Sequence, residues 1–175
     1  MYFANRDVQQ HAQGWVFIHA CRRAFASHIE TALHVSLVDF GAHAQLPQIQ
    51  WQEQPAMARH WRLALKWQGT GLSFDVLRRS LQMFPGIYAE VTCEPTAEAD
   101  GARLMLVPDL GFWFGHMDRA GNVTVNEVQL RRVMSLPPEQ MRAHIAQLLG
   151  SPWDEQLEPL RSSGACLPAA NLRAM

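Results

Sequence analysis

Three residues near the start of the chain have side chains that could bind a metal ion. They are His19, Cys21 and His28, at the end of an apolar run and in the segment after it. Imidazole nitrogen and thiolate sulfur are ligands that zinc prefers, and a strand end beside a helix start could bring the three together. A histidine on an apolar segment is more often hydrogen-bonded inside the fold, so we expect no bound metal.

Asp109 and Asp118 could act as an acid and base pair on either side of an apolar stretch. The alternative is structural: aspartate in a turn usually accepts hydrogen bonds from nearby backbone amides, and both carboxylates could do so. The sequence also contains no GxGxxG, GxSxG or HExxH motif and no phosphate-binding P-loop. We therefore predict no catalytic residue and no cofactor, and we favour a noncatalytic protein over an enzyme.

The composition is that of one ordinary globular domain. The chain has 175 residues, 48% of them hydrophobic, and 15 basic residues nearly balance 16 acidic ones. A chain of this size can bury a core of its own, and a net charge near zero gives no reason to expect nucleic acid or an anionic membrane as partner. The cysteines Cys21, Cys93 and Cys166 are odd in number and far apart, which argues against a disulfide framework.

No apolar run is long enough to cross a bilayer, and the first residues lack the charged start and apolar core of a secretory signal. We therefore expect a cytoplasmic protein without membrane insertion. Residues 1–13 have no periodic pattern and are predicted to be a mobile arm. A single domain is predicted over residues 14–164, followed by an irregular tail over residues 165–175.

The first half of the chain alternates between strand and helix patterns. Strands are predicted at Trp15–His19, around Gln48–Gln52, at Trp61–Trp67 and at Ile87–Glu94. In the last two, every second residue is apolar, so one face should be buried. The other face should be wet unless later elements cover it.

Two helices lie between these strands. The first has a capping box formed by Ser27 and Glu30, and the second follows Gly71 with apolar residues at helical spacing. The order strand, helix, strand, strand, helix, strand is that of the ferredoxin-like split βαβ unit, with an antiparallel sheet and both helices on one face. The predicted fold class is α+β, with this core extended by a β-meander and C-terminal helices.

The stretch Gly101–Val125 is predicted to form that meander. Two apolar runs flank the turn at Pro108–Gly111, and a second turn at Asp118–Asn122 precedes a short last strand. Three helices should follow. Asn126 is placed to cap the first, whose apolar stripe is Leu130, Val133 and Met134. Pro137-Pro138-Glu139 is predicted to begin the second, and Ser151 to cap the third, with Pro152 in its first turn.

Several segments of the chain are also found, in the same order, in a known family. They are Val16-Phe17-Ile18-His19, Trp51-Gln52-Glu53-Gln54-Pro55, Trp67-Gln68-Gly69, Glu90-Val91-Thr92-Cys93-Glu94-Pro95, Pro108-Asp109-Leu110-Gly111, the run from Asp118 to Arg131, and the run from Leu149 to Pro159. Through them the chain resembles an uncharacterised actinobacterial family, the domain of unknown function family numbered 3145, from about Gly14 to Gly164. It departs from that pattern in a shortened loop after Gly69 and in the cysteine at position 93.

The family has no established activity, so the resemblance implies no site residue. It does imply a link to fatty-acid synthesis, because some members are encoded near genes of that process. An acyl-CoA carboxylase or fatty-acid synthase assembly is therefore the implied class of partner.

Three functions remain open from the sequence. A noncatalytic protein-interaction module, or a small accessory subunit of a larger enzyme assembly, is favoured because tryptophans and apolar turns are plentiful while catalytic groups do not cluster. The first alternative is a small-ligand-binding regulatory domain that uses the open sheet face. The second is an unrecognised enzyme.

The predicted interaction surface is centred on Trp113. If Phe112 and Phe114 pack on the core, Trp113 on the other side of the strand is left toward solvent or a partner. An equally weighted alternative is that the helix beginning at Ser151 folds back and covers Trp113. On the first interpretation the surface comprises Pro108, Asp109, Leu110, Trp113, Trp153 and Asp154.

Overall fold

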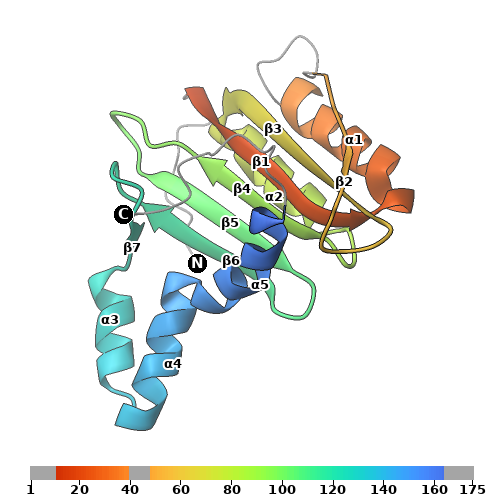
Figure 1. The fold of residues 1–175 in the computed structure, drawn as a ribbon. Helices are drawn as coiled ribbons and strands as arrows, with labels where there is room; N and C mark the ends of the chain where they lie inside the picture. The colour runs from red at the N-terminus through yellow and green to blue at the C-terminus, as the bar shows by residue number, and fades with distance from the viewer. Residues whose placement is uncertain (1–10, 40–47, 164–175) are drawn as a thin grey trace.

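The computed structural model describes residues 11–39 and 48–163. These form one antiparallel sheet of seven strands in the order β2-β3-β1-β4-β5-β6-β7, with helices on both of its faces (Figure 1). The elements in chain order are β1 (His11–Arg22), η1 (Arg23–Phe25), α1 (Ala26–His34), η2 (Val35–Asp39), β2 (Gln52–Glu53), β3 (His60–Thr70), α2 (Gly71–Leu81), β4 (Tyr88–Cys93), β5 (Gly101–Val107), β6 (Gly111–Met117), β7 (Val123–Thr124), α3 (Glu127–Met134), α4 (Pro138–Leu149) and α5 (Ser151–Ser162). The predicted α+β class is confirmed.

β1 lies inside the sheet because it is apolar on both faces. Val16 and Ile18 belong to the main core, while Phe17 points to the opposite face and is also buried. β3 and β4 pair with β1 on its two sides, and Val16 lies opposite Leu65 of β3. The register of both ladders shifts just after Ile18, which marks a β-bulge beside His19.

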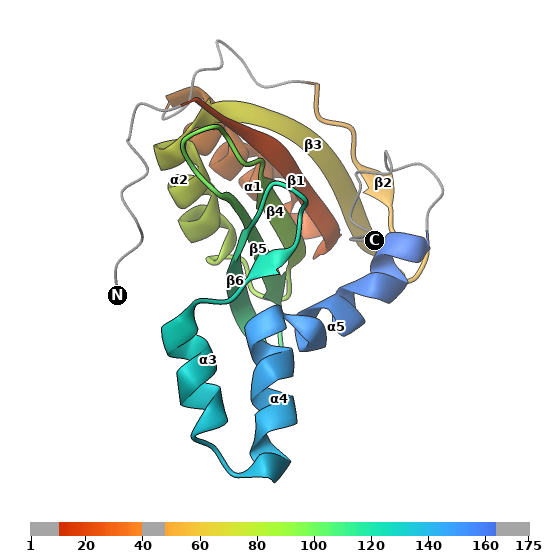
Figure 2. The same ribbon diagram turned by 90° about the vertical axis from the view of Figure 1, so that its left-hand side faces the viewer.

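α1 and α2 cover one face of the sheet, as Figure 2 shows from the side. The buried cluster between these helices and the sheet includes the alternate residues predicted for β3 and β4. From β3 these are Leu63, Leu65 and Trp67, with Trp61 partly buried, and from the fourth strand and its approach they are Ile87, Ala89, Val91 and Cys93.

Details of the first half differ from the sequence prediction. The strand expected at Gln48–Gln52 is reduced to Gln52–Glu53, because only these two residues pair with β3. The predicted capping box is absent: α1 begins at Ala26 after the short helix η1, and Glu30 instead accepts a hydrogen bond from the Trp51 indole at 2.6 Å. β1 begins at His11, earlier than the predicted run. Most of the predicted arm and the predicted tail lie outside the described residues.

β5, β6 and β7 form the predicted meander, and β5 pairs with β4. The turn between β5 and β6 is closed by a hydrogen bond from the Leu110 amide to the Val107 carbonyl at 3.1 Å, and Gly111 follows it with φ of 74°. In the next turn Asp118 accepts hydrogen bonds from the backbone amides of Ala120 and Asn122. β7 extends the sheet only beside His116 and Met117, the last part of β6.

The three C-terminal helices begin and end at turn and cap residues. Asn126 and Gln129 form a capping box at the start of α3, which confirms the cap predicted at Asn126. α4 begins at Pro138 and ends at Leu149. Gly150, with φ of 77°, caps α4 and leads straight into α5, so Ser151 is the first residue of α5 and not its cap. α5 lies across the sheet face opposite α1 and α2, whereas α3 and α4 project beyond the sheet (Figures 1 and 2). No helix in the described part of the chain is both long and apolar enough to span a membrane.

Candidate interaction surface and buried charge cluster

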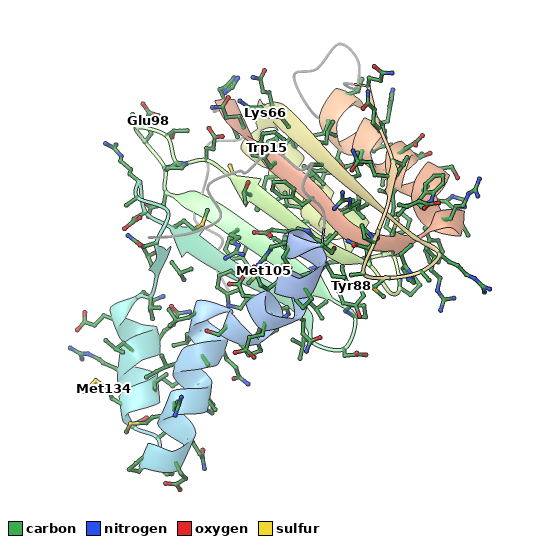
Figure 3. All side chains as sticks on the ribbon, in the orientation of Figure 1. Trp15, Lys66, Tyr88, Glu98, Met105 and Met134 are labelled. Atoms are coloured by element: carbon green, nitrogen blue, oxygen red, sulfur yellow. The ribbon has the colours of Figure 1, made fainter. Side chains whose placement is uncertain are left out.

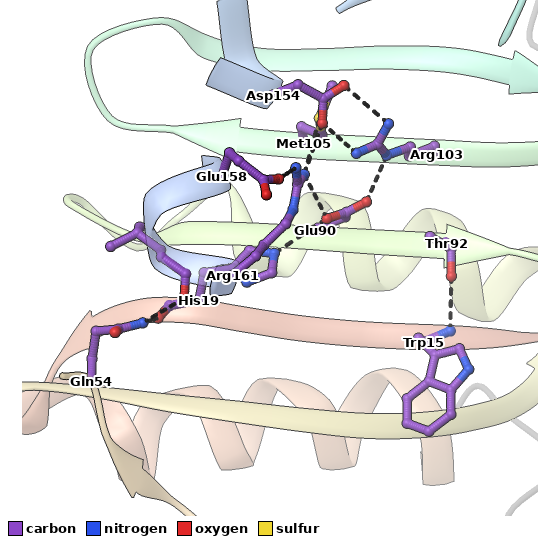
Figure 4. Close-up of polar contacts among 11 residues, drawn as sticks. Trp15, His19, Gln54, Glu90, Thr92, Arg103, Met105, Asp154, Glu158 and Arg161 are labelled. Carbon is purple, nitrogen blue, oxygen red and sulfur yellow. Dashed lines mark hydrogen bonds and ion pairs between the residues drawn. The ribbon is translucent and has the colours of Figure 1, made fainter. Parts of the chain in front are cut away.

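A cluster of charged side chains lies between the sheet and α5, and we call it the Glu90 cluster: His19, Glu90, Arg103, Asp154 and Arg161. Glu90 is at its centre and is fully buried. Its Oε1 accepts a hydrogen bond from Nε of Arg103 at 2.6 Å, and its Oε2 accepts one from Nη2 of Arg161 at 2.9 Å (Figure 4). Nε2 of His19 lies 3.2 Å from the same Oε2.

Electrostatics keep the Glu90 carboxyl ionised. Burial alone raises its pKa, but the hydrogen bond with His19 and the charges of Arg103 and Arg161 outweigh burial and hold the pKa far below its usual range. Burial also works against the charged form of Arg103, yet Glu90 and Asp154 raise its pKa above the ordinary value. A carboxylate held this firmly in its charged form cannot deliver a proton near neutral pH.

The same charges attach α5 to the sheet. Asp154, in the first turn of α5, lies 2.6 Å from Nη2 of Arg103 on β5 and 2.9 Å from Nη2 of Arg161 within the helix. At the other end of α5, the buried Gln54 donates through Nε2 to the carbonyls of His19 and Leu160. Its Oε1 accepts the hydroxyl of Ser163 at 2.6 Å. α5 is thus fixed to the sheet at both ends, which supports a structural role for the cluster.

Alternation predicts that the polar residues of β3 and β4 face water unless later elements cover them, and for Glu90 and Arg62 the structure shows the covered alternative. Both are buried on the face that α5 covers. Arg62 donates to the Gln52 side chain at 3.2 Å, but its Nε and Nη1 have no hydrogen-bond partner among the described residues. The burial of Glu90 could not be predicted from local alternation, because the arginines that compensate its charge come from β5 and α5, far along the chain.

The three candidate metal ligands do not come together. His19 contacts Glu90 on the α5 side of the sheet, while Cys21 belongs to the core cluster that includes α1 and α2. Burial raises the pKa of the Cys21 thiol to about 11, so it remains protonated. His28 is exposed on α1. Across residues 11–39 and 48–163, no three side chains of His, Cys, Asp or Glu are grouped to hold a metal ion.

Asp109 and Asp118, the two candidate acid and base residues, do not form a pair with each other. Asp118 organises its own turn, and its hydrogen bonds with Asn122 lower the pKa of its carboxyl. Asp109 is exposed in the turn between β5 and β6. A shallow depression lies elsewhere, lined by residues that include His11, Cys93 and Glu94. Neither aspartate lines it.

The six residues predicted as an interaction surface divide into two groups. Pro108, Asp109 and Leu110 are exposed at the β5–β6 turn, and Phe112 beside them is 53% exposed. Phe114 instead packs on the core, with its ring 6.3 Å from that of Phe74.

Trp113, Trp153 and Asp154 are engaged within the chain. Trp113 is only 6% exposed, and its indole donates to the Gln147 carbonyl at 2.9 Å. Trp153 donates to the Gly111 carbonyl at 3.2 Å. Trp113 packs in one buried cluster with Leu157 of α5, with Trp153 against it, which agrees with the alternative that the helix beginning at Ser151 covers Trp113.

Five of the nine exposed large apolar residues in the described part of the chain lie on the pair α3 and α4, which we call the helical hairpin. No residue of α4 is buried, and Val133 is the one buried residue of α3. Predicting an apolar stripe of Leu130, Val133 and Met134 was correct as a pattern, but only its middle residue has a buried environment. The exposed apolar residues of the hairpin are Val128 (70%), Leu130 (47%), Met134 (67%), Ile145 (43%) and Leu149 (40%). In Figure 3 the Met134 side chain points outward from α3, away from α4.

Comparison with known proteins identifies a family but no activity. A family model described as "Protein of unknown function (DUF3145)" matches residues 15–174. No curated protein and no solved structure matches the chain.

Proposed function

The chain belongs to the DUF3145 family, and from this premise and its geometry we propose that it is a noncatalytic protein-interaction module or a small accessory subunit of a larger enzyme assembly. The observation that carries the proposal is the helical hairpin. Its helices project beyond the sheet and expose large apolar side chains on both α3 and α4. Large apolar side chains gathered on an exposed part of the surface are typical of protein-binding sites.

The energetics of short helices support the same conclusion. Helices of 8 and 12 residues are marginal in water unless an apolar face is buried by packing. The hairpin buries one residue on α3 and none on α4, so a partner protein would supply the missing contacts. The acidic and basic groups of the Glu90 cluster are already paired with one another, which leaves them no evident catalytic task.

A second candidate surface is the β5–β6 turn. Leu110 and Phe112 are both exposed there, beside Pro108 and Asp109. This surface is smaller than the helical hairpin and is the part of the sequence-predicted surface that stays accessible. A small-ligand function on the sheet face opposite α1 and α2 has less support, because α5 covers the part of that face around Glu90.

The class of partner rests on the family resemblance alone. An enzyme assembly of fatty-acid synthesis, such as an acyl-CoA carboxylase or a fatty-acid synthase, is the first class to test. We expect the encounter to take place in the cytoplasm.

We also propose that the first half of the chain be classed as ferredoxin-like. The strand order β2-β3-β1-β4, all antiparallel, supports this class, as do α1 and α2 on one face. A solved structure of any family member, compared with ferredoxin-like proteins, would test it.

The function is tested by reconstitution with three variants. A partner isolated with the tagged chain is purified and recombined with wild-type protein and with Leu130→Lys/Ile145→Lys. The matched control is Met83→Lys, because Met83 is 79% exposed on the turn after α2 and lies outside the hairpin. Phe112→Lys tests the second surface.

We expect the double variant to lose the stoichiometric complex and Met83→Lys to retain it. If Phe112→Lys alone loses the complex, the β5–β6 turn is the binding surface and the helical hairpin is not. Recovery of no stoichiometric partner, or equal binding by all variants, would contradict the proposal.

A further inference from the structure

Arg62, on β3, is a buried arginine without a carboxylate beside it. It is 5% exposed, and its Nη2 donates to the Gln52 side chain at 3.2 Å. Its Nε and Nη1 are shielded from solvent and have no hydrogen-bond partner among the described residues. A water molecule could accept from either nitrogen, but the positive charge would stay uncompensated. Because a buried charge in this state is costly, Arg62 points to a bound anion.

The carboxylates of the Glu90 cluster are matched by the arginines of that cluster. Glu90 accepts hydrogen bonds from Arg103 and Arg161, and Asp154 forms ion pairs with the same two side chains. Two negative charges therefore meet two positive charges. Arg62 is an additional cation on the same face of the sheet.

The acids of β2 and of the last turns of α5 do not pair with Arg62 either. Glu53 is opposite Trp61 in the β2–β3 ladder, so it lies on the sheet face away from Arg62. Glu158 is exposed, and its carboxylate lies 3.4 Å from Arg161. The last carbonyls of α5 carry only a partial charge. Within the described part of the chain, Arg62 thus has no full counter-charge.

A second arginine without an acidic partner lies on the same face. His60 stands two residues before Arg62 on β3, and Arg22 of β1 is opposite His60 in the β1–β3 ladder. Diagonal neighbours of this kind are about 7–8 Å apart, within reach of two long side chains that share one ligand. Arg22 is exposed and forms no ion pair with any residue that the structure describes.

Little holds this edge of the sheet closed. β2 pairs with β3 only through Gln52 and Glu53, and Gln52 is the one hydrogen-bond partner of the Arg62 guanidinium in the described ranges. Short pairing at an edge opens at a lower free energy than the core of a sheet. An anion can therefore pass the exposed Arg22 and take the place of Gln52 on Arg62.

We propose that Arg62 and Arg22 bind the phosphate group of a small molecule at this edge of the sheet. A phosphate group carries about two negative charges near neutral pH, which matches two arginines without a carboxylate. Hydrogen bonds between guanidinium and phosphate are of the strong, charge-assisted kind. The burial of Arg62 favours a small ligand, because the surface of another protein would not reach a shielded nitrogen. The site goes beyond the proposed docking function and uses no residue of the helical hairpin.

The test measures binding of inorganic phosphate to the full chain by isothermal titration calorimetry at constant ionic strength. We expect a single phosphate to bind per chain and acetate, a monocarboxylate, to bind far more weakly. Arg62→Met should abolish phosphate binding, and Arg22→Gln should weaken it about tenfold by removing one charged hydrogen-bond donor. Arg79→Gln is the matched control, because Arg79 is exposed on α2, and it should bind phosphate like the wild type.

Thermal unfolding separates a ligand site from a structural arginine. Arg62→Met removes an uncompensated buried charge and leaves an apolar side chain in its place, so in phosphate-free buffer the variant should melt no lower than the wild type. Added phosphate should raise the melting temperature of the wild type and leave that of Arg62→Met unchanged, because only a chain that binds the ligand is stabilised by it.

A lower melting temperature of Arg62→Met in phosphate-free buffer would make Arg62 a structural residue and overturn the inference. So would the absence of phosphate binding by the wild type, or undiminished binding by Arg62→Met. Equal binding of acetate would show that the site is not one for a phosphate group. None of these results bears on the docking function, which is tested by Leu130→Lys/Ile145→Lys in the reconstituted complex.

Discussion

Arg161 and Glu90 are 71 residues apart in the sequence, yet Nη2 of Arg161 lies 2.9 Å from Oε2 of Glu90. The carboxylate is fully buried and belongs to the middle of the sheet, and the guanidinium belongs to the last turns of α5. A buried charge is costly without its partner, so separating α5 from the sheet would leave an uncompensated ion on each side. The pair therefore makes the position of α5 depend on the sheet.

Replacing Glu90 by glutamine should strongly destabilise the protein. The amide keeps the shape of the side chain but leaves Arg103 and Arg161 without their shared carboxylate, so the free energy of unfolding should fall by about 3–5 kcal/mol. Denaturant titration measures this. Glu158→Gln is the control, because that carboxylate is 61% exposed and lies 3.4 Å from Arg161, and its effect should stay within about 0.5 kcal/mol. An equal loss of unfolding free energy in both variants would contradict the conclusion that Glu90 is the central charge of the cluster.

The same carboxylate predicts how stability depends on acid. The pKa of Glu90 is lowered in the folded chain from an ordinary value of 4.5, so its contribution is complete above about pH 4.5. As the pH falls below that value, Glu90 becomes protonated in the unfolded chain but stays ionised in the folded chain, so the free energy of unfolding declines. Melting temperatures between neutral pH and pH 3 should therefore drop more steeply for the wild-type protein than for Glu90→Gln. Parallel curves would contradict this assignment.

The buried face of β3 gives a further test of the fold. Leu65 lies in the main core, so Leu65→Ala should lower the free energy of unfolding by about 2–5 kcal/mol. Its neighbour Lys66 is exposed, and Lys66→Ala should change stability by no more than about 0.5 kcal/mol. The reverse order of effects in thermal unfolding would show that the strand faces are exchanged.

Local pattern was enough to predict most elements of this fold. Alternation in β3, helical spacing in α2 and turn residues at Pro108–Gly111 and Asn126 each report a local preference, and all agree with the structure. The burial of Glu90 was not predictable in this way, because it depends on Arg103 and Arg161 from elements far along the chain. Exposure of Leu130 and Met134 was missed for the opposite reason: an apolar stripe does not tell whether anything packs on it.

Gly115 provides an independent test of where Trp113 lies. A Cβ atom at position 115 would collide with the six-membered ring of Trp113, which occupies the space over this glycine. Gly115→Ala should therefore displace the indole and cost about 1–3 kcal/mol of stability. Tryptophan fluorescence should shift to longer wavelength in the variant as water reaches the ring. Unchanged emission and stability would mean that Trp113 is elsewhere.

Trp113→Ala distinguishes a core tryptophan from a docking one. Because Trp113 is 6% exposed and its indole donates to the Gln147 carbonyl at 2.9 Å, truncation should lower the free energy of unfolding by about 3–5 kcal/mol. Phe112→Ala on the neighbouring, 53% exposed position should cost about 0.5 kcal/mol or less. Denaturant titration of the isolated chain measures both. A Trp113→Ala protein that unfolds like the wild type but no longer forms the reconstituted complex would return Trp113 to the docking surface, because only an exposed anchor can be removed without disturbing the monomer.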